Sequence, residues 1–161
     1  MTANSVSENT TSETTPFRSG FVALVGRPSV GKSTLLNACM GQKVAIASPV
    51  AQTTRRRFRA VVNGENSQLV IVDTPGLHKP KDALGKELNK AALGELNDAD
   101  VIAFLIDATK PVGRGDEWVA NHVEQAHAAF KLLVITKADI ATPEQVAEQL
   151  EAAQALAHFD D

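Results

Sequence analysis

"GRPSVGKS", residues 26–33, is the stretch that decides the fold of this chain. It fits the pattern G-x-x-x-x-G-K-[ST], in which a glycine-rich loop joins a strand to a helix and surrounds a phosphate with backbone N–H groups. The apolar run "FVALV" precedes the loop and "STLLNACM" follows it, so both flanking elements are expected. A chance match by an ordinary glycine-rich turn is disfavoured by this setting. The stretch therefore predicts a phosphate-binding loop.

A lysine and a hydroxyl residue close this loop. Lys32 is expected to face the β- and γ-phosphates of a nucleotide, and Ser33 to give an oxygen to Mg²⁺. The helix expected from Lys32 to about Met40 directs its positive end toward the anion. The predicted nucleotide contacts of the loop are Gly26, Arg27, Pro28, Ser29, Val30, Gly31, Lys32, Ser33 and Thr34.

The rest of the chain alternates between short apolar runs and helical patterns. The runs "FVALV", "QLVIVD", "VIAFLID" and "KLLVIT" lack polar alternation, as is typical of strands buried on both faces of a parallel sheet. In "FRAVVNGENSQLVIVD" two strand-like runs flank Asn63-Gly64, a turn signal that predicts an antiparallel hairpin. Together these patterns predict an α/β fold with a mostly parallel sheet.

Two further helices are expected, each with an apolar stripe at helical spacing. The first stripe consists of Val119, Val123, Ala126 and Phe130. The second helix opens with "TPEQ", where Thr142, Pro143 and Gln145 suit the N-cap, the first helical position and a capping box. Its expected buried stripe consists of Val146, Leu150 and Ala153.

"DTPG", residues 73–76, ends one of the buried strands. An aspartate at this position can hold the Mg²⁺ shell, and the unhindered N–H of Gly76 can meet a γ-phosphate oxygen. An ordinary Asp/Pro/Gly turn is the alternative, and the presence of a phosphate loop earlier in the chain disfavours it. The predicted contacts of this segment are Asp73, Thr74, Pro75, Gly76 and Leu77.

"TKAD", residues 136–139, closes the run "KLLVIT" and points to guanine as the base. Guanine presents N1–H and N2–H₂ side by side, and the carboxylate of Asp139 can accept both, whereas adenine offers no such pair. The stem of Lys137 is expected along the base. A polar loop without a ligand is the alternative. The predicted base contacts are Thr136, Lys137, Ala138 and Asp139.

"SPVAQTTRRR", residues 48–57, contains a threonine that could complete Mg²⁺ coordination when a γ-phosphate is present. Thr54 is the first choice and Thr53 the second, with a simple polar loop as the alternative. The predicted metal ligands are therefore Ser33, Thr54 and Asp73. The predicted catalytic residues are Lys32, Thr54 and Gly76.

Bulk properties agree with one domain that works inside a reducing compartment. The chain has 161 residues, a net charge of −3 and a single cysteine, Cys39. The charge disfavours a whole-molecule electrostatic attraction to nucleic acid. No apolar run approaches the ~20 residues of a membrane span. Residues 1–19, rich in Ser, Thr, Asn and Glu, are expected to form a disordered tail and not a signal peptide.

The chain from residue 21 to about 161 resembles the bacterial Era GTPases, of the TrmE–Era–Der branch. The resemblance rests on "GRPSVGKSTLLNACMGQKVAIASPVAQTTRRR", "DTPGLHKPKDALGKELNKAA" and "FLIDATKP". It implies a three-layer, Ras-like P-loop GTPase domain over residues 20–161, which binds GTP and GDP with Mg²⁺. It also implies a role in maturing the small ribosomal subunit through 16S rRNA, in the cytoplasm with some peripheral contact to the cell membrane.

The sequence departs from the family pattern at several positions. Family members usually carry asparagine where this chain has Ser29, and that asparagine helps to hold potassium, so the resemblance leaves potassium open. They also carry asparagine where this chain has Thr136, which lacks an amide donor for the base. Leu77 replaces the glutamine with which Ras-like proteins orient the attacking water.

The family also continues beyond the residues seen here. Ras-like sheets have six strands, and this chain supplies five, so residues 20–161 are expected to lack the last strand, the last helix and an RNA-binding KH domain. "KLLVIT" should then be a bare edge strand. Two alternatives to an active Era-like GTPase stay open: a module that senses GTP or GDP without hydrolysis, and a tRNA-modifying relative.

Overall fold

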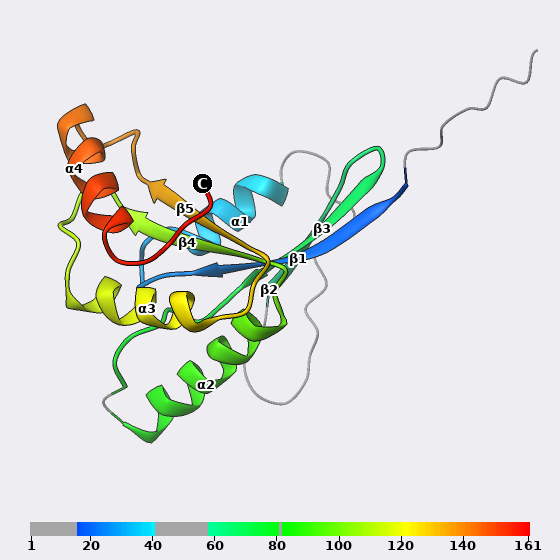
Figure 1. The fold of residues 1–161 in the computed structure, drawn as a ribbon, viewed down its shortest axis with the longest axis horizontal. Coiled ribbons are helices and arrows are strands. Elements are labelled where there is room, and N and C mark those ends of the chain that lie inside the picture. The colour runs from blue at the N-terminus through cyan, green and yellow to red at the C-terminus, as the bar shows by residue number, and fades with distance from the viewer. Residues whose placement is uncertain (1–15, 41–57, 81) are drawn as a thin grey trace, which may run out of the picture.

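A computed structural model describes residues 16–40, 58–80 and 82–161, and its centre is a five-stranded sheet (Figure 1). The strand order is β2-β3-β1-β4-β5, in which β2 runs antiparallel to β3 and every other neighbouring pair is parallel. The predicted parallel sheet and hairpin are confirmed. The strands are β1 (Arg18–Val25), β2 (Phe58–Asn63), β3 (Ser67–Asp73), β4 (Val101–Asp107) and β5 (Phe130–Thr136).

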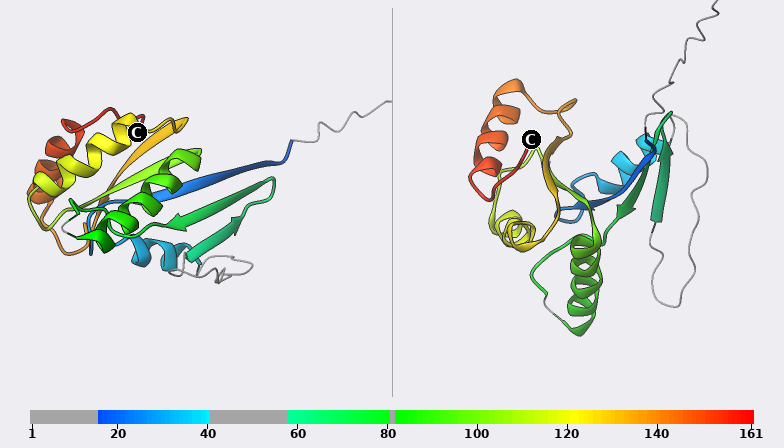
Figure 2. Two further views of the ribbon diagram at one scale, coloured as in Figure 1. Left: turned by 90° about the horizontal axis from the view of Figure 1, so that it is seen from below. Right: turned by 45° about the vertical axis from the view of Figure 1, so that its right-hand side comes forward.

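Helices cover both faces of the sheet and make three layers (Figure 2). One helix lies on one face and three lie on the other, as the two buried clusters show. Of the helices that the structure describes, none combines the length and apolar character that a bilayer crossing requires. The helices are α1 (Lys32–Met40), α2 (Ala83–Asp98), α3 (Arg114–Gln125) and α4 (Pro143–Gln154).

The core lies on either side of β4, whose side chains are almost all buried. Leu36 of α1 packs with Leu105 on one face, while Phe104 on the other face stacks on Phe159 with 5.8 Å between ring centroids. Burial of each such large apolar side chain contributes about 1.5–3 kcal/mol to folding. This two-sided burial explains why the strand reads as a continuous apolar run.

The predicted tail of residues 1–19 extends too far at its end. Arg18 and Ser19 belong to β1, where Arg18 pairs with Ser67 and Ser19 with Gln68 of β3. The Arg18 N–H also donates to the Asn66 carbonyl at 3.0 Å. Backbone pairing therefore continues past the apolar run that marked the strand in the sequence. Residues 1–15 lie outside the described part of the chain.

The apolar stripe expected after Asp116 is correct in its first half. Val119 and Val123 are fully buried on α3, but the helix ends at Gln125. Ala126 is the C-cap, and Phe130 begins β5 with 40% of its surface exposed. The helical spacing of Phe130 was coincidental because a loop and a strand follow the cap.

The capping box of α4, formed by Thr142 and Gln145, is confirmed, but its predicted stripe is wrong at one position. Leu150 is exposed, whereas its neighbour Gln149 is 4% exposed. The Gln149 Oε1 atom accepts a hydrogen bond of 2.8 Å from the Val112 N–H. The inward position between Val146 and Ala153 is therefore occupied by a hydrogen-bonded glutamine and not by the leucine.

The edge of β5 is not bare along its first half, contrary to expectation. The Asp160 N–H donates to the Lys131 carbonyl, and the Leu133 N–H donates to the Asp161 carbonyl, both at 2.8 Å. The Lys131 N–H is also bonded to the Asp160 carboxylate at 2.7 Å. Figure 1 shows this last segment, in red, returning beside β5. Residues 160 and 161 thus satisfy backbone groups along this part of the β5 edge.

Candidate functional site

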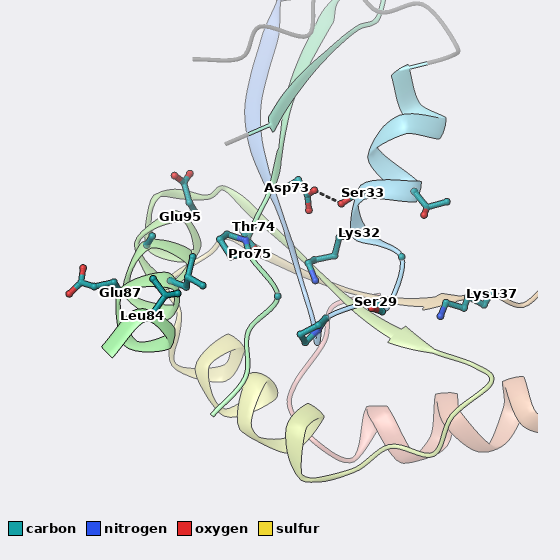
Figure 3. Close-up of a pocket in the computed structure, with 16 residues that line it drawn as sticks. Ser29, Lys32, Ser33, Asp73, Thr74, Pro75, Leu84, Glu87, Glu95 and Lys137 are labelled. Carbon is teal, nitrogen blue, oxygen red and sulfur yellow. Dashed lines mark hydrogen bonds between the residues drawn. The ribbon is translucent and has the colours of Figure 1, made fainter. Parts of the chain in front are cut away.

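A cavity of about 790 Å³ opens at the carboxyl ends of β1 and β3 (Figure 3). Parallel strands bring their following loops to one edge of a sheet, so the phosphate loop and the residues after β3 meet here. The side of α2 that faces them forms the opposite wall. The predicted contacts that line the cavity are Pro28, Ser29, Gly31, Lys32, Ser33, Thr34, Asp73, Thr74, Pro75, Gly76 and Lys137.

Lys32 lies at the bottom of the phosphate loop and is 6% exposed. Its Nζ atom donates to the carbonyls of Gly26 at 3.1 Å and Arg27 at 2.9 Å. Burial lowers the pKa of Lys32 from its ordinary value, and the charge of nearby Asp73 partly opposes this effect. The loop thus encloses an ammonium group that a bound anion would attract.

The backbone of this loop depends on glycine. Gly26 has φ +152°, and a Cβ atom there would lie 2.7 Å from the Leu105 carbonyl oxygen. Gly31 has φ +108°, a conformation that side chains rarely adopt. Ser29 has φ +64°, in the left-handed region where asparagine is more common than serine.

Ser33 and Asp73 bring two oxygen groups together beside Lys32. The Ser33 hydroxyl donates to Asp73 Oδ2 at 2.6 Å (Figure 3). Asp73 Oδ1 is buried and has no hydrogen-bond partner among the described residues. A buried carboxylate oxygen of this kind is costly unless a cation or donor compensates it. Hydroxyl and carboxylate oxygens are ligands that Mg²⁺ prefers, so the pair fits that ion. The third predicted ligand, Thr54, lies outside the described residues, as does Thr53.

The segment after β3 is fixed against the sheet and against the phosphate loop. The Thr74 hydroxyl donates to the Leu24 carbonyl at 2.7 Å and is buried. Gly76 lies on Pro28, because a Cβ atom at Gly76 would come within 2.8 Å of the proline Cα. The lack of a side chain at this position is therefore required by packing as well as by any ligand.

Leu77 does not face the cavity, although it was predicted as a nucleotide contact. Its side chain is fully buried in the core cluster of α2 and α3. Its N–H donates to the Gly26 carbonyl at 3.1 Å. An apolar side chain gains more from the core than from a polar cavity, which explains its orientation.

Arg27 also turns away from the cavity. Its Nε atom forms an ion pair of 2.7 Å with Asp116, a fully buried residue of α3. Val30, another predicted contact, is buried with Leu36 in the core. Arg27 and Val30 therefore contribute their backbone to the loop, while their side chains pack against the rest of the protein and anchor the loop.

The predicted base loop is tied to the phosphate loop by Thr136. Its hydroxyl lies 2.6 Å from the Val30 carbonyl and 3.0 Å from the Ile106 carbonyl, so it is directed inward. Lys137 has φ +57° and lines the cavity. Ala138 and Asp139 are exposed and do not line it. Asp139 thus lies at the surface, two residues after the cavity-lining Lys137.

Asp107, at the end of β4, was not singled out from the sequence. It is 2% exposed, and its Oδ2 atom accepts from Lys137 Nζ at 2.6 Å. Its Oδ1 atom accepts from the N–H and the hydroxyl of Thr109. Burial alone would raise the pKa of Asp107, but these hydrogen bonds outweigh it and lower the pKa from its ordinary value. The signal was present in "FLID", where an aspartate ends a buried strand beside the base loop.

One face of α2 was also missed. Leu84, Glu87 and Glu95 of this helix line the cavity, although Figure 3 shows the carboxylates of Glu87 and Glu95 directed outward, away from Lys32. With Leu88 and Ala91, which also line the cavity, they repeat at intervals of three or four residues and share one face of the helix. A shared face does not indicate which part of the fold it meets, so its position opposite the phosphate loop was not predicted.

This chain is similar in sequence to a known protein family and to individual known proteins. The model of a family described as 50S ribosome-binding GTPase matches residues 21–137. The chain is 45% identical over 146 residues to GTPase Era of Leifsonia xyli subsp. xyli, an alignment that covers 91% of this chain and 49% of that protein. The chain thus spans about half the length of the curated relatives it matches.

Two solved structures share the fold at higher than 25% identity. A crystal structure of Era in complex with MgGDPNP and nucleotides 1506–1542 of 16S ribosomal RNA has a TM-score of 0.69 and 36% identity, covering 89% of this chain and 50% of that one. A substituted variant of Aquifex aeolicus Era bound to GDP·AlF4− has a TM-score of 0.65 and 38% identity, covering 85% and 47%.

Proposed function

We propose that this chain, which belongs to the 50S ribosome-binding GTPase family, binds GTP and hydrolyses it to GDP and phosphate. The observation that carries the proposal is the shared cavity, in which the Lys32 ammonium lies beside Ser33 and the unpartnered Asp73 Oδ1. A cation, a glycine-rich backbone and two oxygen ligands are the groups that a nucleotide triphosphate with Mg²⁺ requires. Era relatives bind MgGDPNP and GDP·AlF4−, which supports the same ligand class here.

Ser33 and Asp73 are the described residues that would hold Mg²⁺. When bound, the ion neutralises charge on the β- and γ-phosphate oxygens. Thr54 is retained as a proposed third ligand from the sequence alone. Potassium also stays a prediction, because position 29 carries serine in place of the family's asparagine.

The chemistry assigned to the chain itself is positioning and charge stabilisation. Lys32 would leave the loop carbonyls of Gly26 and Arg27 and donate to phosphate oxygens, where negative charge develops during transfer. Gly76 lines the cavity, and its N–H would meet the γ-phosphate. Leu77 cannot orient water because its side chain lies in the core.

Base selection is assigned to residues 136–139. Asp139 would accept the N1–H and N2–H₂ groups of guanine, and the stem of Lys137 would lie along the ring. Asp107 supports this assignment because its carboxylate fixes the Lys137 ammonium at 2.6 Å. The Thr136 hydroxyl is bonded to carbonyls and is therefore not the base reader.

The wider role follows the Era relatives. One of them was solved with nucleotides 1506–1542 of 16S ribosomal RNA, so we assign this chain to maturation of the small ribosomal subunit in the cytoplasm. The assignment concerns a protein of which this chain matches about half. Peripheral membrane contact, which the family resemblance implies, stays a prediction.

A second candidate is a module that binds guanine nucleotides with very slow turnover. The burial of Leu77 favours it, because the residue that follows "DTPG" offers no group to the attacking water. Both candidates require the same binding site. They differ in the rate of the chemical step alone.

Single-turnover hydrolysis of GTP by the full 161-residue chain separates them. We expect phosphate release that requires Mg²⁺, is stopped by chelation and is absent with ATP. Parallel reactions with potassium and sodium test the role of Ser29. Binding of GTP without phosphate release would establish the sensing module, and failure to bind GTP or GDP would refute both candidates.

A further inference from the structure

The side chain of Arg27 leaves the phosphate loop and reaches the first turn of α3. Its Nε atom lies 2.7 Å from Asp116 Oδ1, and Asp116 is 0% exposed. The other oxygen, Oδ2, accepts from the N–H of Gly113, the N-cap of the helix, at 3.0 Å. Oδ1 is therefore paired by charge with the loop, without an aligned hydrogen bond, and Oδ2 is hydrogen-bonded to the helix.

The backbone of α3 is shaped to receive this side chain. A Cβ atom at Gly115 would lie 2.7 Å from Arg27 Cδ and 3.4 Å from Arg27 Cγ. The arginine stem thus crosses the helix where it has no side chain. Removal of one partner from a buried ion pair is strongly unfavourable, because the other charge stays buried without compensation. Arg27 is accordingly fixed in this position.

The same residue reaches the phosphate site through its backbone. The Arg27 carbonyl accepts from Lys32 Nζ at 2.9 Å, and the next residue, Pro28, lines the cavity. One residue therefore joins α3 to the lysine that is assigned to the phosphates. A displacement of the Arg27 side chain would move the carbonyl and the start of the loop with it.

We infer that Asp116 and Gly115 are positioning residues for phosphate binding, which act through Arg27 on the backbone around Lys32. Neither residue lines the cavity. The inference rests on the proposed function, since it assumes that the loop receives nucleotide phosphates. It also reassigns Arg27 from a ligand contact to the link between the loop and α3.

Two variants of the full chain separate a positioning role from a role in stability alone. Asp116→Asn keeps an oxygen for the Gly113 N–H but removes the charge that faces Arg27. The double variant Arg27→Met with Asp116→Asn removes both charges and leaves no buried ion unpaired, which favours folding. Glu117→Gln is the matched control, because this exposed carboxylate lies in the same helical turn.

The readouts are the dissociation constant for fluorescently labelled GDP and the midpoint of urea unfolding. We expect Asp116→Asn to lower both the midpoint and the GDP affinity. The double variant should regain most of the midpoint and yet bind GDP on the order of 10- to 100-fold more weakly, since the loss of one charge-assisted hydrogen bond between the displaced loop and the phosphates costs about that factor. Glu117→Gln should match the unchanged chain in both measurements.

Recovery of GDP affinity together with the urea midpoint in the double variant would overturn the inference, because Asp116 would then act on stability alone. Unchanged GDP affinity in folded Asp116→Asn would overturn it as well. If Asp116→Asn does not fold, the GDP affinity of the double variant tests the inference. Failure of the unchanged chain to bind GDP is a different result, since it would refute the proposed function.

Discussion

The phosphate loop and the base loop are held in different ways. In the phosphate loop Val30 and Lys32 are 2% and 6% exposed. In the base loop Asp139 is exposed, and the next residue, Ile140, is 71% exposed. Under the proposed function, phosphate recognition would thus be organised by buried groups before any ligand arrives. Base recognition would depend on one carboxylate at the surface.

This difference predicts where binding free energy resides. A preorganised, enclosed set of donors is worth more than the same groups at an exposed site, where water competes. Changes in the phosphate loop should therefore lower affinity most. Changes around the base loop should act more on the choice of nucleotide than on the strength of binding.

Lys32→Ala is expected to have the largest effect. Truncation of a buried charge partner removes on the order of 100-fold or more in affinity for GDP and GTP. Equilibrium titration with labelled nucleotides measures the loss, and circular dichroism checks that the variant is folded. A folded variant with unchanged GDP affinity would show that the enclosed loop is not the phosphate site, and the comparison would fail.

Asp139→Asn should have a smaller effect on affinity and a larger one on selectivity. Loss of a charge-assisted pair of hydrogen bonds weakens GDP binding by about 10- to 100-fold. Xanthine carries a carbonyl in place of the guanine N2–H₂ group, so an amide donor suits it better. We expect competition assays to show a gain for xanthosine diphosphate over GDP. Retained preference for guanine would remove Asp139 from the base site.

Asp107→Asn should lower stability in a pH-dependent way, because its hydrogen bonds from Lys137 and Thr109 are charge-assisted. The folded protein holds the pKa of Asp107 below its ordinary value of 3.8, so the stabilisation is complete above that value and is lost as pH falls through the lowered pKa. At neutral pH the loss should be about 1.5–3 kcal/mol.

Urea unfolding of the Asp107→Asn variant and the unchanged chain, from neutral pH to below 3.8, measures this difference. The two free energies of unfolding should converge on acidification. A difference that stays constant with pH would show that the Asp107 charge does not hold Lys137. GDP affinity at neutral pH should fall by several-fold at most, since the proposed contact of the Lys137 stem with the base is one of several nucleotide contacts.

Thr136→Asn should give the smallest change, and in the opposite direction. Asparagine can keep a donor toward the Val30 carbonyl and add an amide group near the base. One neutral hydrogen bond is worth about 0.5–1.5 kcal/mol, so GDP affinity should rise by about two- to tenfold. Thr136→Val serves as the control without a donor. A weaker GDP complex with asparagine than with threonine would contradict this prediction.

The sequence was sufficient for the elements whose signal is local. The spacing of Gly26, Gly31 and Lys32 identified the phosphate loop, and the apolar run before Asp73 placed that residue at the end of a strand. Each of these features depends on neighbours in the chain. The five strands and three of the four described helices, α1, α3 and α4, follow from the same local patterns, whereas α2 was not predicted.

Contacts between distant residues could not be read in this way. Arg27 and Asp116 are far apart in sequence, and both belong to segments that predict a surface loop and a helix start. Leu150 was predicted inside and Gln149 outside, because a hydrophobic pattern cannot foresee a hydrogen bond to Val112. Leu77 was assigned to the ligand by its position after "DTPG", whereas the core claims its side chain.

The hydrogen bond between Thr136 and the Val30 carbonyl has a consequence for ligand size. It joins the two loops at a fixed spacing, so under the proposed function a nucleotide would be bound at both ends like a chelating ligand. A nucleoside or a pyrophosphate alone would engage one end and gain nothing from the other. In the intact nucleotide, attachment at the phosphates would present the base to its loop at a high effective concentration. Selectivity for a complete guanine nucleotide would then depend on the linkage of the two sites, and the threonine hydroxyl sets the distance between the two loops.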